Sequence, residues 1–186
     1  SAATEKIWFD VVSRSGITDF LGYEENNGKA IIQDIIVIDK SVKNITKDIE
    51  AVLILNQTPF YAESGGQIGD TGSISFNESV FEVTDTKKKL GLHLHYGKLK
   101  NGNLKIGDDV LLSIDSNRRD SLRSYHSATH LLHQSLRDTL GDHVSQKGSL
   151  VSFDRLRFDF SHHKQISDDE IKTIESNVEK IISLSY

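Results

Sequence analysis

The sequence has no cysteine, no methionine and only one proline, Pro59, among its 186 residues. Without cysteine the chain can form no disulfide and offers no thiolate to a metal, so a metal site within it must use histidine or carboxylate ligands. An intact reading frame begins with methionine, whereas this sequence begins with Ser1. We therefore expect it to be a segment of a longer protein.

Long apolar runs are also missing. No run approaches the roughly 20 residues that a membrane-spanning helix needs, and the N-terminus lacks the basic-then-apolar layout of a signal peptide. These absences predict a soluble, cytoplasmic protein with no membrane partner. With 37% hydrophobic residues, the chain suits one ordinary domain or two small ones that share an interface.

The charge is small and unevenly distributed. The net charge of -5 argues against non-specific electrostatic binding of nucleic acid by the whole chain. However, residues 118–164 carry eight Lys and Arg against five Asp, a net charge of +3, and they hold six of the eight histidines. An anionic partner is therefore expected to bind between residues 118 and 164.

The first part of the chain, residues 1–117, has the pattern of a β-rich domain. A helical or irregular N-terminal segment, which contains Trp8 and Phe9, precedes this domain. Short apolar runs rich in β-branched residues alternate with turn residues, which is typical of a small antiparallel barrel or sandwich. A looser sheet remains the alternative. The runs are "AIIQDIIVID" (30–39), "AVLIL" (51–55), "GSISF" (72–76), "SVFEVTD" (79–85), "LHLHYGKL" (92–99) and "DVLLSID" (109–115).

Helical periodicity begins at residue 118, so residues 118–186 are expected to form a second, α+β part. Residues recurring at steps of three and four predict an amphipathic helix over 118–141: Leu122, Tyr125, Thr129, Leu132, Leu136 and Leu140. "SLVSF" (149–153) and "RLRFDF" (155–160) predict strands, and a capping box of Ser167 with Glu170 opens a last helix. The inner face of this helix is expected to carry Ile171, Ile174, Val178 and Ile181. The predicted fold class is thus α+β, with an antiparallel β-barrel followed by an α+β core.

The predicted helix carries a basic, histidine-rich face. His126 and His130 are four residues apart, so their imidazoles can reach one metal from successive turns, although a pair of solvent-facing histidines is the alternative. The glutamate of HExxH peptidases is absent, which argues against that class. Arg119, Arg123 and Arg137 lie within about 60° of this pair on a helical wheel. They are candidate phosphate contacts or a solvated face.

A glycine-rich stretch, "TPFYAESGGQIGDTG" (58–72), holds Pro59 and four of the thirteen glycines. It predicts a tight turn, a phosphate cradle or the wall of a pocket. The Gly65-Gly66-Gln67 tripeptide also occurs in translation release factors, which promote peptidyl-tRNA hydrolysis, but three residues are a weak signal.

Three segments in this order resemble the editing domain of alanyl-tRNA synthetases and its free-standing relatives. They are the stretch 58–72, "HSATHLLHQSLRDTLGDHVSQKGSL" (126–150) and "RLRFDFSH" (155–162). The resemblance implies hydrolysis of tRNA(Ala) that is wrongly charged with serine or glycine. The implied partners are the acceptor end of tRNA(Ala) and the rest of the parent synthetase. An alanine pocket separates such small side chains poorly, so a second, hydrolytic selection step is needed.

The resemblance also implies roles for individual residues. His126 and His130 match two zinc ligands, Thr129 matches a threonine that recognises the serine side chain, and Gln146 matches a glutamine that positions the substrate. Lys147, Gly65, Gly66 and Gln67 are placed in the same substrate cleft, with Arg119 and Arg123 as phosphate contacts. Alternatively, Thr129 bonds back to a helix carbonyl, and Gln146 and Lys147 are loop residues before a strand. His133, His143, His162 and His163 are expected at the surface or beside the site.

The family's other two zinc ligands, a cysteine and a histidine in a C-x-x-x-H pattern, would lie beyond Tyr186. We therefore expect a core truncated at its C-terminus, with weak zinc binding and little hydrolysis in this segment. The zinc either anchors the substrate or activates water.

Three other functions are kept as alternatives: a non-catalytic tRNA-binding module, a free-standing trans-editing deacylase, and a Gly-Gly-Gln hydrolase. The related editing domain of threonyl-tRNA synthetases shares an HxxxH-containing core, but "TPFYAESGGQ" and the barrel before the helix favour the alanine system. "EKIWFDVVSRSG" (5–16), leading into "FLGY" (20–23), is typical of a linker from an aminoacylation domain. It favours a full synthetase as the parent.

Overall fold

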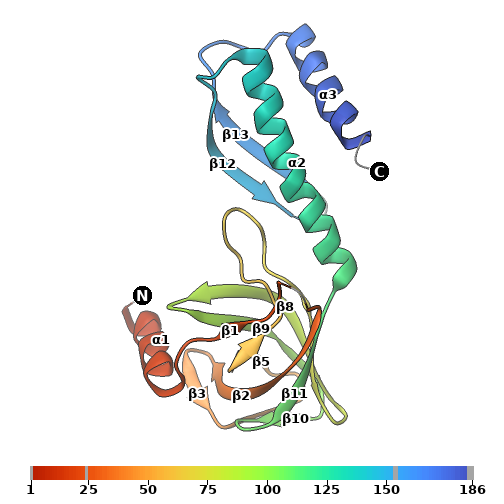
Figure 1. Cartoon of the computed structure of the whole chain (residues 1–186). Helices are drawn as coiled ribbons and strands as arrows, with labels where there is room; N and C mark the ends of the chain where they lie inside the picture. The colour runs from red at the N-terminus through yellow and green to blue at the C-terminus, as the bar shows by residue number, and fades with distance from the viewer. Residues whose placement is uncertain (1, 24, 153–154, 184–186) are drawn as a thin grey trace. The chain divides into compact units, whose positions relative to one another are not determined.

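The computed structural model describes residues 2–23, 25–152 and 155–183 (Figure 1). The chain divides into two compact units. The first comprises Ser1–Ser64 and Ile68–Arg119, and the second comprises Gly65–Gln67 and Asp120–Tyr186. The predicted α+β class is confirmed.

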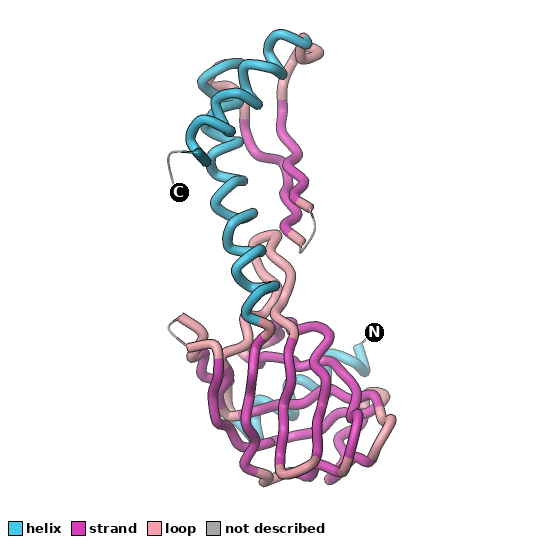
Figure 2. Tube along the Cα trace, turned by 90° about the vertical axis from the view of Figure 1, so that its right-hand side faces the viewer, coloured by secondary structure: helices cyan, strands magenta, loops and turns pink. Residues whose placement is uncertain are grey.

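The first unit is a closed antiparallel barrel of six strands (Figure 2). Neighbouring strands pair in the order β11-β7-β8-β9-β5-β2, and β11 pairs again with β2, which closes the ring. The strands are β2 (Asn27–Val37), β5 (Glu50–Leu55), β7 (Gly72–Phe76), β8 (Ser79–Lys89), β9 (Leu92–Asn101) and β11 (Asp109–Ile114). Each of the six predicted apolar runs contributes one of them.

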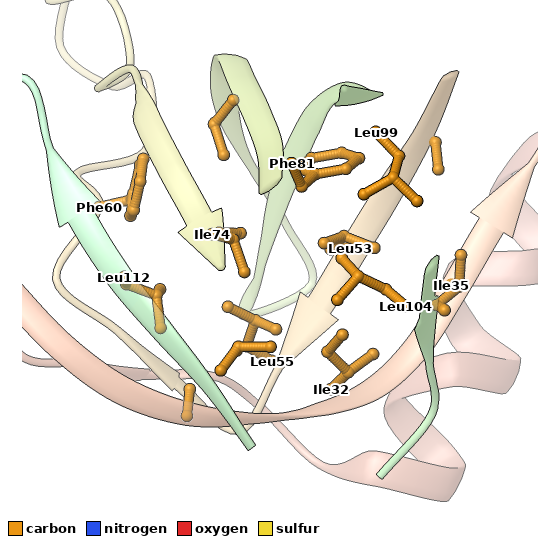
Figure 3. Close-up of a cluster of buried hydrophobic side chains, with 14 of the residues drawn as sticks. Ile32, Ile35, Leu53, Leu55, Phe60, Ile74, Phe81, Leu99, Leu104 and Leu112 are labelled. Atoms are coloured by element: carbon orange, nitrogen blue, oxygen red, sulfur yellow. The ribbon is translucent and has the colours of Figure 1, made fainter. Parts of the chain in front are cut away.

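The barrel closes because its strands alternate between inward and outward side chains. In β11, Val110, Leu112 and Ile114 are buried, whereas the residues between them are exposed. The inward side chains of all six strands meet in one apolar core, as Figure 3 shows for Leu53, Ile74 and Phe81, among others. A closed ring of strands leaves no long unpaired edge.

Helix α1 (Ala2–Ser15) packs on the outside of the barrel. Trp8 and Val11 are buried against a second apolar cluster that includes Ile36, Val52 and Leu92. Short strands complete the first unit: β1 (Asp19–Phe20), β3 (Lys40–Val42), β4 (Asn44–Thr46), β6 (Gln57–Thr58) and β10 (Asn103–Lys105). Strand β1 pairs with β6, β3 with β2, and β4 with β10.

The second unit contains two helices and a hairpin. Helix α2 (Ser116–Leu140), most of which belongs to this unit, lies alongside the antiparallel strands β12 (Ser145–Val151) and β13 (Leu156–Ser161), and α3 (Asp168–Ser183) packs against α2 (Figure 1). Their shared core contains Leu136, Val144 and Ile174. Among the described helices, none is long and apolar enough to cross a membrane.

Two details of the second unit differ from the sequence-based expectation, and a third falls partly outside the described residues. Strand β12 begins at Ser145, so Gln146 and Lys147 lie in the strand and not in a loop before it. The predicted strands 149–153 and 155–160 include residue 153, which lies outside the described residues. Ile171 and Ile181, expected on the inner face of the last helix, are about 40% exposed.

Candidate functional site

Helix α2 begins at a well-formed N-cap. The carboxylate Oδ1 of Asp115 accepts a hydrogen bond of 3.1 Å from the backbone N–H of Arg118, which would otherwise lack a partner in the first turn. From this fixed start, helical geometry places His126 and His130 on neighbouring turns of one face.

His126 and His130 form an exposed pair of imidazoles. Their ring centroids are 5.0 Å apart and the ring planes are perpendicular. Both side chains are exposed. Imidazoles on successive turns of one helix can supply two of the four ligands of a tetrahedral zinc shell, in which Zn–N bonds are about 2.0–2.1 Å long.

Thr129 lies between the two histidines in sequence, but its side chain turns into the protein. It is 6% exposed, and its hydroxyl donates a hydrogen bond of 2.9 Å to the carbonyl oxygen of Tyr125, one turn earlier. The hydroxyl therefore makes the back-bond that sequence reasoning kept as the alternative. Its oxygen retains lone pairs that can accept a further hydrogen bond.

The interpretation of Arg119 as an exposed phosphate contact is wrong. Its side chain is buried, 4% exposed, and the residue belongs to the first unit. The guanidinium nitrogen Nη2 lies 3.3 Å from the buried carboxylate of Asp70 and donates to the carbonyl oxygen of Pro59 at 3.3 Å. A helical wheel cannot show that this first turn of α2 packs inside the barrel unit. Arg123, one turn later, is exposed.

The tip of the glycine-rich stretch, Gly65–Gln67, is part of the second unit. The carbonyl oxygen of Gly66 accepts a hydrogen bond of 2.7 Å from the backbone N–H of Val151, and Gln67 forms a parallel bridge with Val151. Gly66 has a φ of +82°, and a Cβ there would lie 2.8 Å from the backbone oxygen of Ser149. Glycine is therefore required for the tip to lie alongside β12.

Gln146 and Lys147 lie at a β-bulge. Gln146 pairs with Phe160 and Gly148 with Asp159, so Lys147 is the extra residue between the two pairs. Both side chains are exposed. Bulges re-aim side chains and are over-represented next to active sites. Among the described residues, no hydrogen bond or ring contact joins Gln146 or Lys147 to the imidazoles of His126 and His130.

The other histidines of this unit divide into two groups. His133 is half-buried, with its ring centroid 5.3 Å from that of Phe158. In contrast, His143, His162 and His163 form a compact triangle whose ring centroids are 4.9–5.0 Å apart. Desolvation, followed by the neighbouring His143, His162 and Lys164, lowers the pKa of His163. Sequence reasoning assigned this group no role, although the adjacent pair His162-His163 was a usable signal.

Two sets of residues in the second unit can therefore bind a metal or a substrate. The exposed HxxxH pair can hold a metal in part, with the amide of Gln146 and the ammonium of Lys147 available elsewhere in the unit to bind a polar or anionic substrate. The histidine triangle offers imidazole donors of its own.

Comparison with known proteins assigns the chain to a family. Residues 2–118 match the family described as tRNA synthetases class II (A). Over 182 residues, the chain is 50% identical to an alanine-tRNA ligase of Parvibaculum lavamentivorans, 48% to one of Chelativorans sp. and 46% to one of Rhodopseudomonas palustris. Each alignment covers 97% of this chain and 20% of the relative. The chain therefore spans about a fifth of the length of the curated relatives it matches, and it belongs to the family of class II (A) tRNA synthetases.

Proposed function

We propose that this chain is part of the editing region of an alanine-tRNA ligase, which hydrolyses the esters of Ser-tRNA(Ala) and Gly-tRNA(Ala). The observation that carries the proposal is the exposed imidazole pair of His126 and His130 on successive turns of α2. The similarity to alanine-tRNA ligases over 97% of the chain supports the choice of tRNA.

The donor set of the pair fits zinc. His126 and His130 would supply two neutral nitrogen ligands, which is half of a tetrahedral shell, and the chain has no cysteine to add. When bound, zinc would supply a Lewis acid beside the ester. We therefore expect weak zinc affinity and slow hydrolysis in the 186-residue chain, and full activity in the longer parent protein.

The proposed reaction is hydrolysis of the aminoacyl ester by a water molecule. A water oxygen attacks the carbonyl carbon of the aminoacyl ester, the bond from that carbon to the ribose oxygen breaks, and the water proton passes to the ribose oxygen. The products are the free amino acid and uncharged tRNA. Groups that hold the ester and the water at a fixed separation can lower the barrier of such a reaction by about 7–11 kcal/mol.

The chain offers residues for this positioning. The Thr129 oxygen, which donates its proton to Tyr125, can still accept a hydrogen bond from the hydroxyl of a serine substrate. The exposed amide of Gln146 can both donate to the ester and accept from water. Lys147 and Arg123, both exposed cations, suit the phosphates of the tRNA acceptor end.

The test is release of serine from Ser-tRNA(Ala) by the parent protein and by the 186-residue chain. We expect His130→Ala in the parent to reduce hydrolysis at least about tenfold, since even indirect support of a zinc ligand is worth about 10–100-fold. Gln134→Ala is the matched control, because Gln134 is exposed on the same helix and its amide donates to the carboxylate of Asp138 on the same surface. Hydrolysis that survives His130→Ala and zinc removal would contradict the proposal.

Two other outcomes would identify other functions. Loss of hydrolysis with Gln67→Ala alone, with no effect of Thr129→Ala, would favour a Gly-Gly-Gln hydrolase. Binding of tRNA(Ala) by the parent without any release of serine would favour a non-catalytic tRNA-binding module.

A further inference from the structure

We propose that His143, His162 and His163 form a binding site for a divalent transition metal, separate from the His126–His130 pair. Of the histidine and acidic side chains that the structure describes, these three form the one group whose ligand atoms all lie within 4.8 Å of one another. The proposal is independent of the editing function.

The three imidazoles come from two segments that the hairpin brings together. His143 lies in the turn between α2 and β12, and His162 and His163 directly follow β13. Ser145 pairs with Ser161 at this end of the hairpin, and their hydroxyls are 2.8 Å apart. The backbone on both sides of the triangle is therefore fixed, while the rings themselves remain free to turn.

Two of the nitrogens already point at each other. Nε2 of His143 and Nδ1 of His162 are 2.8 Å apart, which is a hydrogen bond in which one nitrogen donates and the other accepts. A metal ion can replace the shared proton, with one lone pair from each ring. In a tetrahedral site with metal–nitrogen bonds of about 2.05 Å, ligand nitrogens are about 3.3 Å apart. His143 and His163 are exposed and His162 is half-buried, so rotation of the two exposed side chains can provide this spacing.

The donor chemistry selects the metal class. Three neutral imidazoles suit Zn²⁺, Co²⁺, Ni²⁺ and Cu²⁺, whereas Mg²⁺ and Ca²⁺ prefer oxygen ligands. Lys164, next to His163, adds positive charge. The carboxylate of Glu170 is engaged with the backbone N–H of Ser167, and that of Asp142 lies 3.9 Å from Arg137. The triangle therefore supplies three protein ligands and leaves a fourth position to water or an anion.

Bound metal would join the α2–β12 turn to the segment that leads into α3. These two segments are 19 residues apart, measured from His143 to His162. A metal that binds only the folded form stabilises it by mass action. We therefore expect added metal to stabilise the second unit as well as to bind.

The experiment is a Co²⁺ titration of the 186-residue chain, purified without a histidine tag and followed by the visible d–d absorption. We expect saturation at one Co²⁺ per chain for this site. His162→Ala should weaken binding at least about tenfold, since loss of a group that merely orients a ligand costs about 10–100-fold. The double variant His126→Ala/His130→Ala is the matched control and should keep the absorption. His163→Ala, checked for folding by circular dichroism, provides a second variant.

The results separate this site from the HxxxH pair. If the absorption disappears in His126→Ala/His130→Ala and survives in His162→Ala and His163→Ala, the metal binds the pair and the proposal is wrong. Absence of any Co²⁺ binding by the intact chain would also overturn it. A rise in the unfolding temperature with Zn²⁺ that His162→Ala removes would support the stabilising role.

Discussion

Asp70 and Arg119 form a buried ion pair at the base of the glycine-rich stretch. The two side chains are 1% and 4% exposed, and the carboxylate also accepts the backbone N–H of Tyr61 at 2.7 Å. The pair therefore links the start of α2 to the stretch 58–72 within the first unit. Removal of one partner would leave a buried charge that has lost its main counter-charge.

We expect Arg119→Met to lower the free energy of unfolding of the first unit by about 3–5 kcal/mol. Urea denaturation followed by the fluorescence of Trp8 measures the change, because Trp8 packs against the barrel. Arg123→Met is the matched control and should change stability by less than about 0.5 kcal/mol, since Arg123 is exposed. Equal effects of the two substitutions would show that the pair does not stabilise the barrel.

A second buried residue, His95, makes the barrel sensitive to acid. Its side chain is fully buried, and burial lowers its pKa to about 4. The carbonyl oxygen of Leu53 can only accept, so Nδ1 of His95 carries the proton at 2.9 Å from it. The unprotonated Nε2 then accepts from the hydroxyl of Thr58 at 2.8 Å. Both nitrogens are thus satisfied in the neutral form, and burial disfavours the charged form.

The sign of the pH dependence follows from this pKa. The unfolded chain binds a proton at His95 near pH 6.5, whereas the folded chain does so only near pH 4, so stability is complete above about pH 6.5 and is lost as the pH falls towards about 4. The loss is at most about 3 kcal/mol. Measured by urea denaturation, the stability difference between the native chain and His95→Gln should shrink over this range. His126→Gln, at an exposed position, should show no such change.

Helix α3 shows how local sequence fixes an element boundary. The hydroxyl of Ser167 accepts the backbone N–H of Glu170 at 3.1 Å, and the carboxylate of Glu170 accepts the N–H of Ser167 at 3.0 Å. These are the reciprocal bonds of a capping box. They also lower the pKa of Glu170, chiefly through the hydrogen bonds with Ser167.

We expect Ser167→Ala to destabilise the second unit by about 1 kcal/mol and to raise the pKa of Glu170 towards its ordinary value. An NMR titration of the Glu170 carboxyl and urea denaturation measure the two effects. Ser176→Ala is the control within the same helix, because Ser176 is exposed and mid-helix, where alanine is the better helix former. A free energy of unfolding that Ser167→Ala leaves unchanged would contradict the capping role, whereas part of the lowering of the Glu170 pKa should remain because residue 167 keeps its backbone N–H.

The elements were predictable from sequence where a regular apolar pattern coincided with a clear stop signal. The six barrel runs and α2 follow this rule. The start of β12 was missed because Gln146 and Lys147 are polar and exposed, so they add nothing to an apolar alternation. The burial of Arg119 was missed because its partner, Asp70, is 49 residues away in sequence. The back-bond of Thr129 was foreseen as an alternative because it is local.

At the scale of the whole molecule, the two units have cores of very different size. Among the described residues, the barrel core joins sixteen buried residues from all around the ring, whereas the core cluster of the second unit joins three, Leu136, Val144 and Ile174. Buried apolar contacts set the free energy at which a region opens. The second unit should therefore be the less stable part of the chain.

We expect the backbone amides of β12 and β13 to exchange with deuterium at a lower opening free energy than those of β5 and β9. Native-state hydrogen exchange in increasing, sub-denaturing urea distinguishes the two groups. Added Zn²⁺ should raise the value for the second unit alone if the histidine triangle binds metal. A single opening free energy for all four strands would show that the chain unfolds as one cooperative body.

The hydrogen bond between Gly66 and Val151 has a consequence for synthesis. The two residues are about 85 positions apart, so a ribosome that adds about 5–20 residues per second makes Val151 about 4–17 s after Gly66. The last barrel strand ends at Ile114, so all six strands emerge while the tip Gly65–Gln67 still has no partner. The nascent barrel can therefore close with this tip open to its surroundings, and the tip acquires its hydrogen-bond partner only when β12 has been made.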